Sequence, residues 1–368
     1  MTRRGSPTAG KTHRSGPAGT ARYRDRFAAG LADDFFRQFA GSLFASSIGI
    51  GTYLGECDDA EDARYAKTIR AALEAGINLV DTSANYRCQR SERVVGRVLD
   101  EAITAGVIAR DEIIVCTKGG YIPLDTATPP TREEYLAYLQ RTFVETGIVS
   151  AEDVAGGGHS LSPSFLTHQI ALSKANLRVQ TLDVYYLHNP EQQLDYVQPA
   201  RFRTILRRAF ALLEERVESG DIGCYGCATW NGLRAAPDSR GHLDLSELVS
   251  IARDVSGDGH HFRAVQLPVN LAMSEAVRVP TQRLGGTRVV PLLQAAEELG
   301  LSIVASATLM QSRLTTGLPA AVRDSFPGLT TDAQRAIAFV RSLPGVTTAL
   351  VGMRSVDHLR ENLGAAAR

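Results

Sequence analysis

The chain has 368 residues, of which 44% are hydrophobic and 22% charged, and its 40 basic side chains balance its 40 acidic ones. This zero net charge argues against nucleic acid or an anionic membrane as the main partner, and no apolar run reaches the roughly 18 residues that a bilayer requires. Five thinly spread cysteines fit no disulfide framework, so we expect a cytoplasmic protein.

The first 35 residues are predicted to form a flexible basic arm. From Met1 to Arg24 the sequence has no acidic residue and is rich in Gly, Pro, Ser and Thr. Apolar periodicity is absent before Phe27, so no docked helix is expected. We therefore predict disorder in this arm and no part in catalysis.

From residue 36 onward, short apolar strands alternate with amphipathic helices. The helix over 62–75 ends at Gly76 and the helix over 92–105 ends at Gly106, since glycine is a common helix C-terminal signal. Eight strands are predicted, over residues 47–51, 77–81, 113–118, 182–188, 222–227, 264–267, 302–305 and 348–351.

Repeated βα units require parallel strands, and eight of them close a (β/α)8 TIM barrel. We expect residues 36–368 to form this one domain. The competing fold is an open doubly wound sheet, which needs a phosphate-binding loop after its first strand. The segment Gly49–Gly55 resembles such a loop, but its third glycine comes one residue late and the acidic Glu56 follows. The barrel is therefore the preferred fold.

Strand three is followed by a long insertion, over residues 119–159. It contains one helix with a capping-box start, from Thr131 to Glu134, and then a run of three glycines ending at Gly158. A helix begins after it at Pro163. The insertion is either a lid over the site or a purely structural element.

Cys224 and Cys227 form a C-x-x-C pair within the fifth strand. Residues three apart in a strand point to opposite faces, so the two thiols cannot meet on one metal ion. The chain has no second pair to complete a zinc site. We therefore predict buried small residues and no metal site.

Four polar residues follow or end neighbouring strands, where barrels place their catalytic groups. Asp81 and Lys118 could form a buried ion pair. A lysine charge beside the phenol of Tyr86 would lower its pKa and make it a usable proton donor. His188 could orient a carbonyl group. Each residue alone also has an ordinary structural explanation, but four at adjacent strand ends favour a catalytic site.

At these residues the sequence resembles the aldo-keto reductase family, from about Phe36 to Ala366. The resemblance implies that Asp81, Tyr86, Lys118 and His188 form a catalytic tetrad. It also implies that residues 36–44 form a hairpin that closes the bottom of the barrel. The segments that carry it are Gly76–Tyr86 with Ser91, Glu92 and Gly96, then Val115–Lys118, and Leu182–His188.

The resemblance further implies a dinucleotide site. Arg354 precedes the last helix and would bind the 2′-phosphate, which favours NADPH over NADH. Gln266 would hold the nicotinamide carboxamide. The implied cofactor contacts are Gly51, Thr52, Asp81, Asn189, Gln266, Gly352, Arg354, His358 and Asn362.

The chain departs from the family's usual residues around the nicotinamide ring at Ala228, Thr229 and Ser306. These changes weaken the expected grip on the ring, and Trp230 could supply a replacement surface. The aromatic side chains expected in the substrate pocket are Tyr53, Tyr121 and Trp230.

Together these features predict NADPH-dependent reduction of a small-molecule aldehyde or ketone, or the reverse alcohol oxidation. A dinucleotide-sensing binding subunit and a Schiff-base lyase using Lys118 remain alternatives. The lyase is less favoured, because a carboxylate partner such as Asp81 keeps a lysine charged. The sequence gives no signal for an oligomeric partner.

Overall fold

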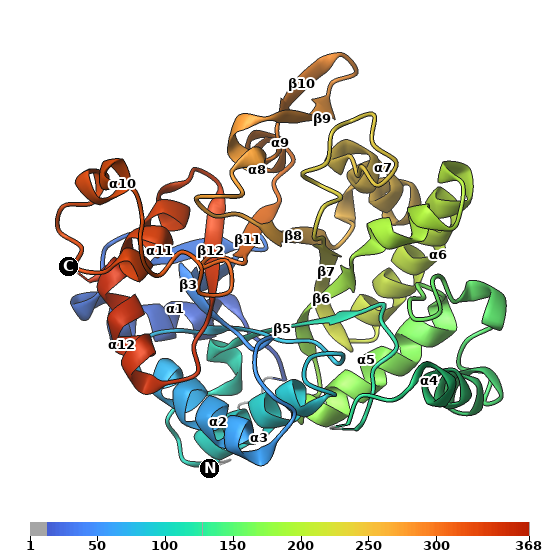
Figure 1. Ribbon diagram of the computed structural model, residues 1–368, viewed down its shortest axis with the longest axis horizontal. Helices are drawn as coiled ribbons and strands as arrows, with labels where there is room; N and C mark the ends of the chain where they lie inside the picture. The colour runs from blue at the N-terminus through green and yellow to red at the C-terminus, as the bar shows by residue number, and fades with distance from the viewer. Residues whose placement is uncertain (1–12, 127, 368) are drawn as a thin grey trace, which may run out of the picture.

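Eight parallel strands close into a barrel at the centre of the molecule, and helices form a ring around them (Figure 1). The computed structural model describes residues 13–126 and 128–367. The predicted (β/α)8 fold is confirmed. Around the barrel the strands are β3 Ile48–Gly51, β4 Leu79–Asp81, β5 Ile114–Gly119, β6 Leu182–His188, β7 Ile222–Ala228, β8 Phe262–Pro268, β11 Ser302–Ser306 and β12 Val346–Gly352.

Four of the surrounding helices, α2, α7, α11 and α12, begin at a residue whose side chain caps the helix. Asp58 caps α2 by accepting a hydrogen bond from the Glu61 N–H, and Asp244 caps α7 in the same way. Among the described residues, no helix is long and apolar enough to cross a membrane. These helices are α2 Asp59–Glu74, α3 Arg90–Thr104, α5 Pro163–Leu177, α6 Pro199–Glu218, α7 Leu245–Ser256, α8 Glu275–Arg278, α9 Leu292–Glu298, α10 Ala320–Ser325, α11 Asp332–Ser342 and α12 Val356–Leu363.

The core has two layers, one inside the barrel and one between the strands and the helices. Cys224 belongs to the inner apolar cluster and Cys227 to the outer one. The predicted opposite orientation of these two side chains is therefore confirmed. Two close-packed layers of this kind hold the strand ends, and the side chains on them, in fixed positions.

Two antiparallel hairpins flank the barrel. The expected one comprises β1 Phe36–Phe39 and β2 Leu43–Ser46, and it places Phe39 and Ala45 in the inner apolar cluster. It therefore closes one end of the barrel. The second, β9 Pro280–Leu284 with β10 Arg288–Pro291, is not predicted from the sequence and forms the projection at the top of Figure 1.

The expected disorder of the N-terminal arm is wrong for its second half. Helix α1, Pro17–Phe27, packs against β2 and the loop before β5. Tyr23 is fully buried, and its hydroxyl donates to the carbonyls of Leu73 and Ile77 at 2.6 and 3.0 Å. Arg22 and Arg26 both pair with Glu112. Arg22 also pairs with Asp111, so one aromatic anchor and three ion pairs hold this helix, which is why no apolar period predicts it. Residues 1–12 lie outside the described part.

The insertion after β5 folds around a small core of its own. It contains α4 Arg132–Leu139, with the predicted capping box of Thr131 and Glu134, followed by a π-helical turn at Gln140–Val144. Ile122, Leu139, Phe143, Val149 and Phe165 form an apolar cluster separate from the barrel core. The insertion is thus a structured unit beside the barrel.

Candidate active site

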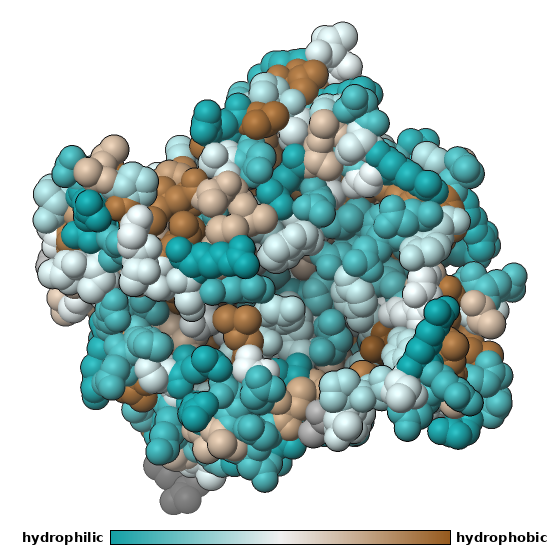
Figure 2. Space-filling view, viewed as in Figure 1, coloured by the Kyte–Doolittle hydropathy of each residue, from teal (hydrophilic) through white to brown (hydrophobic). Residues whose placement is uncertain are grey.

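A cavity of about 840 Å³ lies at the carboxyl ends of the barrel strands. Figure 2 shows a mainly hydrophilic hollow over the middle of the molecule. Most of the residues singled out in the sequence line this cavity, whereas Lys118, Arg354, His358 and Asn362 do not. The sequence-predicted residues in its wall are Gly51, Thr52, Tyr53, Asp81, Tyr86, Tyr121, His188, Asn189, Trp230, Gln266 and Gly352.

A buried ion pair lies at the base of the cavity. The Lys118 ammonium donates to Asp81 Oδ1 at 2.6 Å and to the Thr82 carbonyl at 2.9 Å. The Gln266 amide, from β8 across the barrel, donates to Asp81 Oδ2 at 2.7 Å. Burial disfavours the lysine charge, but the contact with Asp81 outweighs it and the pKa of Lys118 is raised. Lys118 is therefore a fixed positive charge.

Tyr86 lies directly above this pair, on the loop after β4. The Lys118 ammonium is 4.7 Å from the centre of its ring. Burial raises the pKa of Tyr86, and the lysine charge offsets this only in part. The expected lowering of this pKa is therefore wrong in net direction, because desolvation of the phenolate exceeds the lysine's attraction. The phenol stays protonated at neutral pH, as a proton donor must.

His188 completes the group at the end of β6. Its ring centre lies 5.7 Å from that of Tyr86, and its Nδ1 lies 3.4 Å from the Ser83 hydroxyl. Burial and the nearby Lys118 hold the pKa of His188 well below its ordinary value. A neutral imidazole can donate one hydrogen bond into the cavity without adding charge.

His159, in the insertion, is a site residue that the sequence does not reveal. Its Nε2–H donates to the His188 carbonyl at 2.7 Å, while its Nδ1 accepts from the Gln193 amide at 2.8 Å. Burial lowers the pKa of His159 to about 4. The only signal in the sequence is a histidine after three glycines. The insertion is thus hydrogen-bonded to the backbone of β6 at His188, the tetrad residue on that strand.

Glu191 lines the cavity and was not predicted from the sequence, whereas Thr229, also in the wall, was predicted only to weaken the grip on the nicotinamide ring. Glu191 Oε1 accepts from the backbone N–H groups of Trp230, Asn231 and Gly232, at 2.9, 3.1 and 3.1 Å. It therefore fixes the loop that carries Trp230. The Thr229 hydroxyl is buried and has no hydrogen-bond partner among the described residues. An unpaired polar atom in a cavity wall fits a ligand group there.

The far end of the cavity reaches the first and last strands. Gly51 and Gly352 are neighbours in the pairing of β3 with β12, and Ser355 caps α12 just beyond them. Arg354, on the same loop, is half exposed and contacts Glu61 at 3.4 Å. On α12, His358 is exposed and Asn362 is buried. A helix N-terminus, two glycines and a half-exposed guanidinium, held in the described part of the chain only by its long contact with Glu61, suit a phosphorylated ligand.

Comparison with known proteins identifies relatives over part of the chain. The aldo/keto reductase family model matches residues 47–250, more than half of the sequence. A 6-dehydroglucose reductase from Novosphingobium aromaticivorans is 25% identical over 53% of this chain and 51% of its own length. An aldo-keto reductase from Mycolicibacterium smegmatis is 48% identical over 19% of this chain and 21% of its own length. The aligned parts span about half of the first relative and about a fifth of the second.

Solved structures resemble the whole fold. An aldo/keto reductase from Klebsiella pneumoniae, in complex with NADP and acetate, has a TM-score of 0.60 at 20% identity, covering 90% of this chain and 89% of its own. A glycerol dehydrogenase from Gluconobacter oxydans gives 0.60 at 19% identity and covers 90% of both chains. At this identity the likeness concerns the fold. Together with the family match and the barrel-mouth site, it leads to one conclusion: the chain belongs to the aldo/keto reductase family of oxidoreductases.

Proposed function

We propose that the protein reduces a small-molecule aldehyde or ketone with NADPH, and that the same site can run the reaction in reverse. One observation carries the proposal. A protonated tyrosine, a buried Lys–Asp pair and a neutral histidine meet at the base of a single large cavity.

The cavity has the groups that a dinucleotide needs. Gln266 and the unpaired Thr229 hydroxyl would hold the nicotinamide end, and Gly51, Thr52 and Gly352 leave room for the backbone of the cofactor. At the far end Arg354, with His358 and Asn362 on α12, would bind the 2′-phosphate and adenine. When bound, NADPH supplies the hydride that reaches the carbonyl carbon. The structural neighbour from Klebsiella pneumoniae is a complex with NADP, which supports this cofactor.

The tetrad would manage the proton. Tyr86 donates its hydroxyl proton to the carbonyl oxygen as negative charge develops there. The Lys118 charge stabilises the tyrosinate that remains, and Asp81 holds the lysine in place. His188 donates a hydrogen bond to the same oxygen and orients the substrate. In the reverse direction Tyr86 removes the proton of an alcohol.

The geometry gives little support to a Schiff-base lysine. The Lys118 side chain is fully buried, and its ammonium is committed to Asp81 and to the Thr82 carbonyl. A Schiff-base lysine must be neutral and must reach the substrate carbonyl. The surroundings of Lys118 meet neither condition, and this favours the reductase over the lyase.

The test is Tyr86→Phe, measured by NADPH oxidation with a panel of aldehydes and ketones. Loss of the general acid should lower the rate about 10²–10⁴-fold while NADPH affinity, followed by fluorescence, stays unchanged. Tyr185→Phe is the matched control, because this buried hydroxyl has no described partner and lies outside the cavity. A Tyr86→Phe variant as fast as the parent would refute the mechanism. Tight NADPH binding without turnover in the parent would instead favour a sensing subunit.

A further inference from the structure

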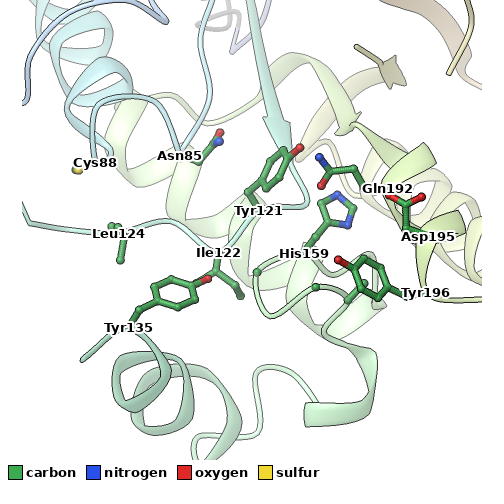
Figure 3. A pocket seen from close by; sticks show the side chains of 13 residues that line it. Asn85, Cys88, Tyr121, Ile122, Leu124, Tyr135, His159, Gln192, Asp195 and Tyr196 are labelled. Carbon is green, nitrogen blue, oxygen red and sulfur yellow. The ribbon is translucent and has the colours of Figure 1, made fainter. Parts of the chain in front are cut away.

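A second cavity, of about 440 Å³, adjoins the active-site cavity (Figure 3). The two cavities share Asn85, Tyr121, Gln192 and Asp195. The remainder of the second wall comes largely from the insertion and from the segment after β6. These further lining residues are Cys88, Ile122, Leu124, Tyr135, Ala155, Gly156, Gly158, His159 and Tyr196.

The wall of the second cavity combines aromatic rings with uncharged or acidic polar groups. Tyr121, Tyr135 and Tyr196 present rings and hydroxyls, as Figure 3 shows. The side chains of Gln192 and Asp195 have no hydrogen-bond partner among the described residues. In the described part of the chain, no lysine or arginine lines either cavity.

This chemistry selects among substrates. Hydroxyl groups can donate to the Asp195 carboxylate and exchange hydrogen bonds with Gln192, while the C–H faces of a carbon chain or ring pack on tyrosine. A carboxylate or phosphate would find no compensating cation and would face Asp195 instead. Resting on the proposed function, we propose that the second cavity binds the hydroxyl-bearing tail of a neutral, polyhydroxylated carbonyl substrate.

The experiment compares propanal, xylose and glucuronate as substrates of the full chain. The parent should prefer xylose to glucuronate by at least about tenfold in kcat/KM, as expected for roughly 1.4 kcal/mol of unfavourable charge. Asp195→Leu should raise KM for xylose about 5–30-fold and leave propanal unchanged, because propanal has no tail to fill the second cavity. Glu133→Gln, an exposed change on α4, is the control.

The outcomes separate the two proposals. A parent that reduces propanal but treats xylose and glucuronate alike overturns the second cavity as a polyhydroxyl site. So does an Asp195→Leu variant that loses propanal and xylose activity equally. A parent that reduces none of the three overturns the proposed reductase function itself.

A different feature concerns two cysteines at the rim of the site. The sulfur atoms of Cys57 and Cys88 lie 3.3 Å apart, and both side chains are partly exposed, whereas Cys116, Cys224 and Cys227 are buried. Among the described residues, no third ligand joins them in a metal-binding group. A disulfide needs about 2.05 Å, so the two sulfurs need to approach by little more than 1 Å.

The two thiols face each other from the loops that carry Tyr53 and Tyr86. Cys57 follows the Tyr53 segment, and Cys88 comes two residues after Tyr86. The two rings already meet edge to face at 5.0 Å. Arg87 joins the loops by donating to the Glu56 carbonyl at 2.8 Å. Residues 87–89 all have positive φ, of 48°, 53° and 68°, so this turn has few other conformations available.

We infer that Cys57 and Cys88 are a reversible oxidation site that takes a hydroperoxide and closes a disulfide between the two loops. Cys88 lines the second cavity, where a small peroxide can reach it. Its sulfur attacks the peroxide, the O–O bond breaks, and a sulfenic acid forms while an alcohol or water leaves. The Cys57 sulfur then attacks the sulfenic sulfur, and water leaves as the S–S bond forms. Burial raises the pKa of Cys57 to about 11, so Cys57 is protonated at neutral pH and must lose its proton as it attacks the sulfenic sulfur.

Closure should reduce turnover. The constrained turn transmits a shift of Cys88 to Tyr86, and a displacement near 1 Å at a reacting group can cost about 10²-fold in rate. The link also encloses about 30 residues, which should raise Tm by roughly 3–5 °C.

The experiment treats the full chain with hydrogen peroxide, removes the excess, and maps the peptides without reduction. A Cys57–Cys88 peptide should appear, Tm should rise, and kcat should fall at least about tenfold. Dithiothreitol should reverse all three changes, and Cys57→Ser should show none of them. Absence of the linked peptide overturns the inference, and so does a linked protein with unchanged kcat and Tm. Peptide mapping and Tm report on the site whether or not the proposed reductase function holds.

Discussion

His159 and His188 are buried neighbours whose neutral state depends on the folded structure. His159 has a pKa of about 4, against 6.5 for an ordinary histidine, because burial disfavours its charge. Its two ring nitrogens are both used, one by the His188 carbonyl and one by Gln193. A proton on His159 would remove the acceptor that Gln193 needs. Protonation of His159 at acidic pH should therefore destabilise the folded protein.

The sign of this effect follows from linkage. Below pH 6.5 the unfolded chain binds a proton at His159 that the folded chain refuses until about pH 4. The stability that this residue contributes is present above pH 6.5 and is lost as the pH falls, by about 3 kcal/mol in all. Urea unfolding at about pH 7.5 and about pH 4.5 should show a smaller acid loss in His159→Gln than in the parent. His242→Gln, a partly exposed control, should keep the parent's acid loss. Equal acid losses in His159→Gln and the parent would contradict this assignment.

Arg354 is the residue that we expect to set the preference for NADPH over NADH. Its guanidinium is half exposed, and its contact with Glu61 is long, so it is available to a 2′-phosphate. Arg354→Ala should weaken NADPH binding about 10–100-fold and leave NADH binding unchanged, because NADH lacks that phosphate. Fluorescence titration of both dinucleotides measures this, with Arg360→Ala on the following helix, α12, as the control. Equal loss of both cofactors would point to a structural role.

Among the elements, helix α1 shows how a short segment can hold a barrel without an apolar face. Tyr23 is its anchor, since the ring is fully buried and the hydroxyl reaches two carbonyls near the end of α2. Arg22 and Arg26 add ion pairs to Glu112, which is itself buried. Removal of residues 1–27, which include α1, is therefore expected to destabilise the barrel.

The anchor can be separated into packing and hydrogen bonding. Tyr23→Ala should lower the free energy of unfolding by about 3–5 kcal/mol, because it leaves a cavity the size of a ring. Tyr23→Phe keeps the ring and should cost only about 1 kcal/mol. Urea titration of both variants decides the matter, and a Tyr23→Ala variant as stable as the parent would show that α1 does not support the barrel.

The elements also show what the sequence could and could not predict. The eight strands and the hairpin at β1 and β2 follow from local patterns and from a shared family signature. Helix α1 was missed because its energy comes from one tyrosine and a distant carboxylate, Glu112. His159 was missed because its role depends on a backbone carbonyl 29 positions away. The direction of the Tyr86 pKa was wrong because desolvation depends on burial, which sequence does not measure.

At the scale of the whole molecule, the barrel and the insertion have separate apolar cores. Contacts between them include the His159 bond to β6, the Gln169 bonds to Gly120 and Tyr121, and the Phe165 ring on α5. Regions with small separate cores open at lower free energy than the main core. The insertion should therefore open without unfolding the barrel.

Phe143→Ala tests this independence. Phe143 is almost fully buried among apolar side chains of the insertion and the Phe165 ring of α5. Its truncation should speed hydrogen exchange and proteolysis within residues 122–158 by about 100-fold or more, since a buried phenylalanine contributes about 3 kcal/mol or more. Exchange in the barrel strands should stay within a few-fold of the parent. Equal acceleration in both regions would show that they form one cooperative unit.

The separate core of the insertion has a consequence for how this chain can diverge. The proton-handling groups stand at the ends of barrel strands or on the loop after β4, so a change that damages the barrel core would also displace them. Much of the wall of the second cavity comes from the insertion. Substitutions there would destabilise the small apolar core of the insertion rather than the core of the barrel. A library built on this chain can therefore vary residues 122–158 in search of new substrates while it keeps the reaction centre of the barrel intact.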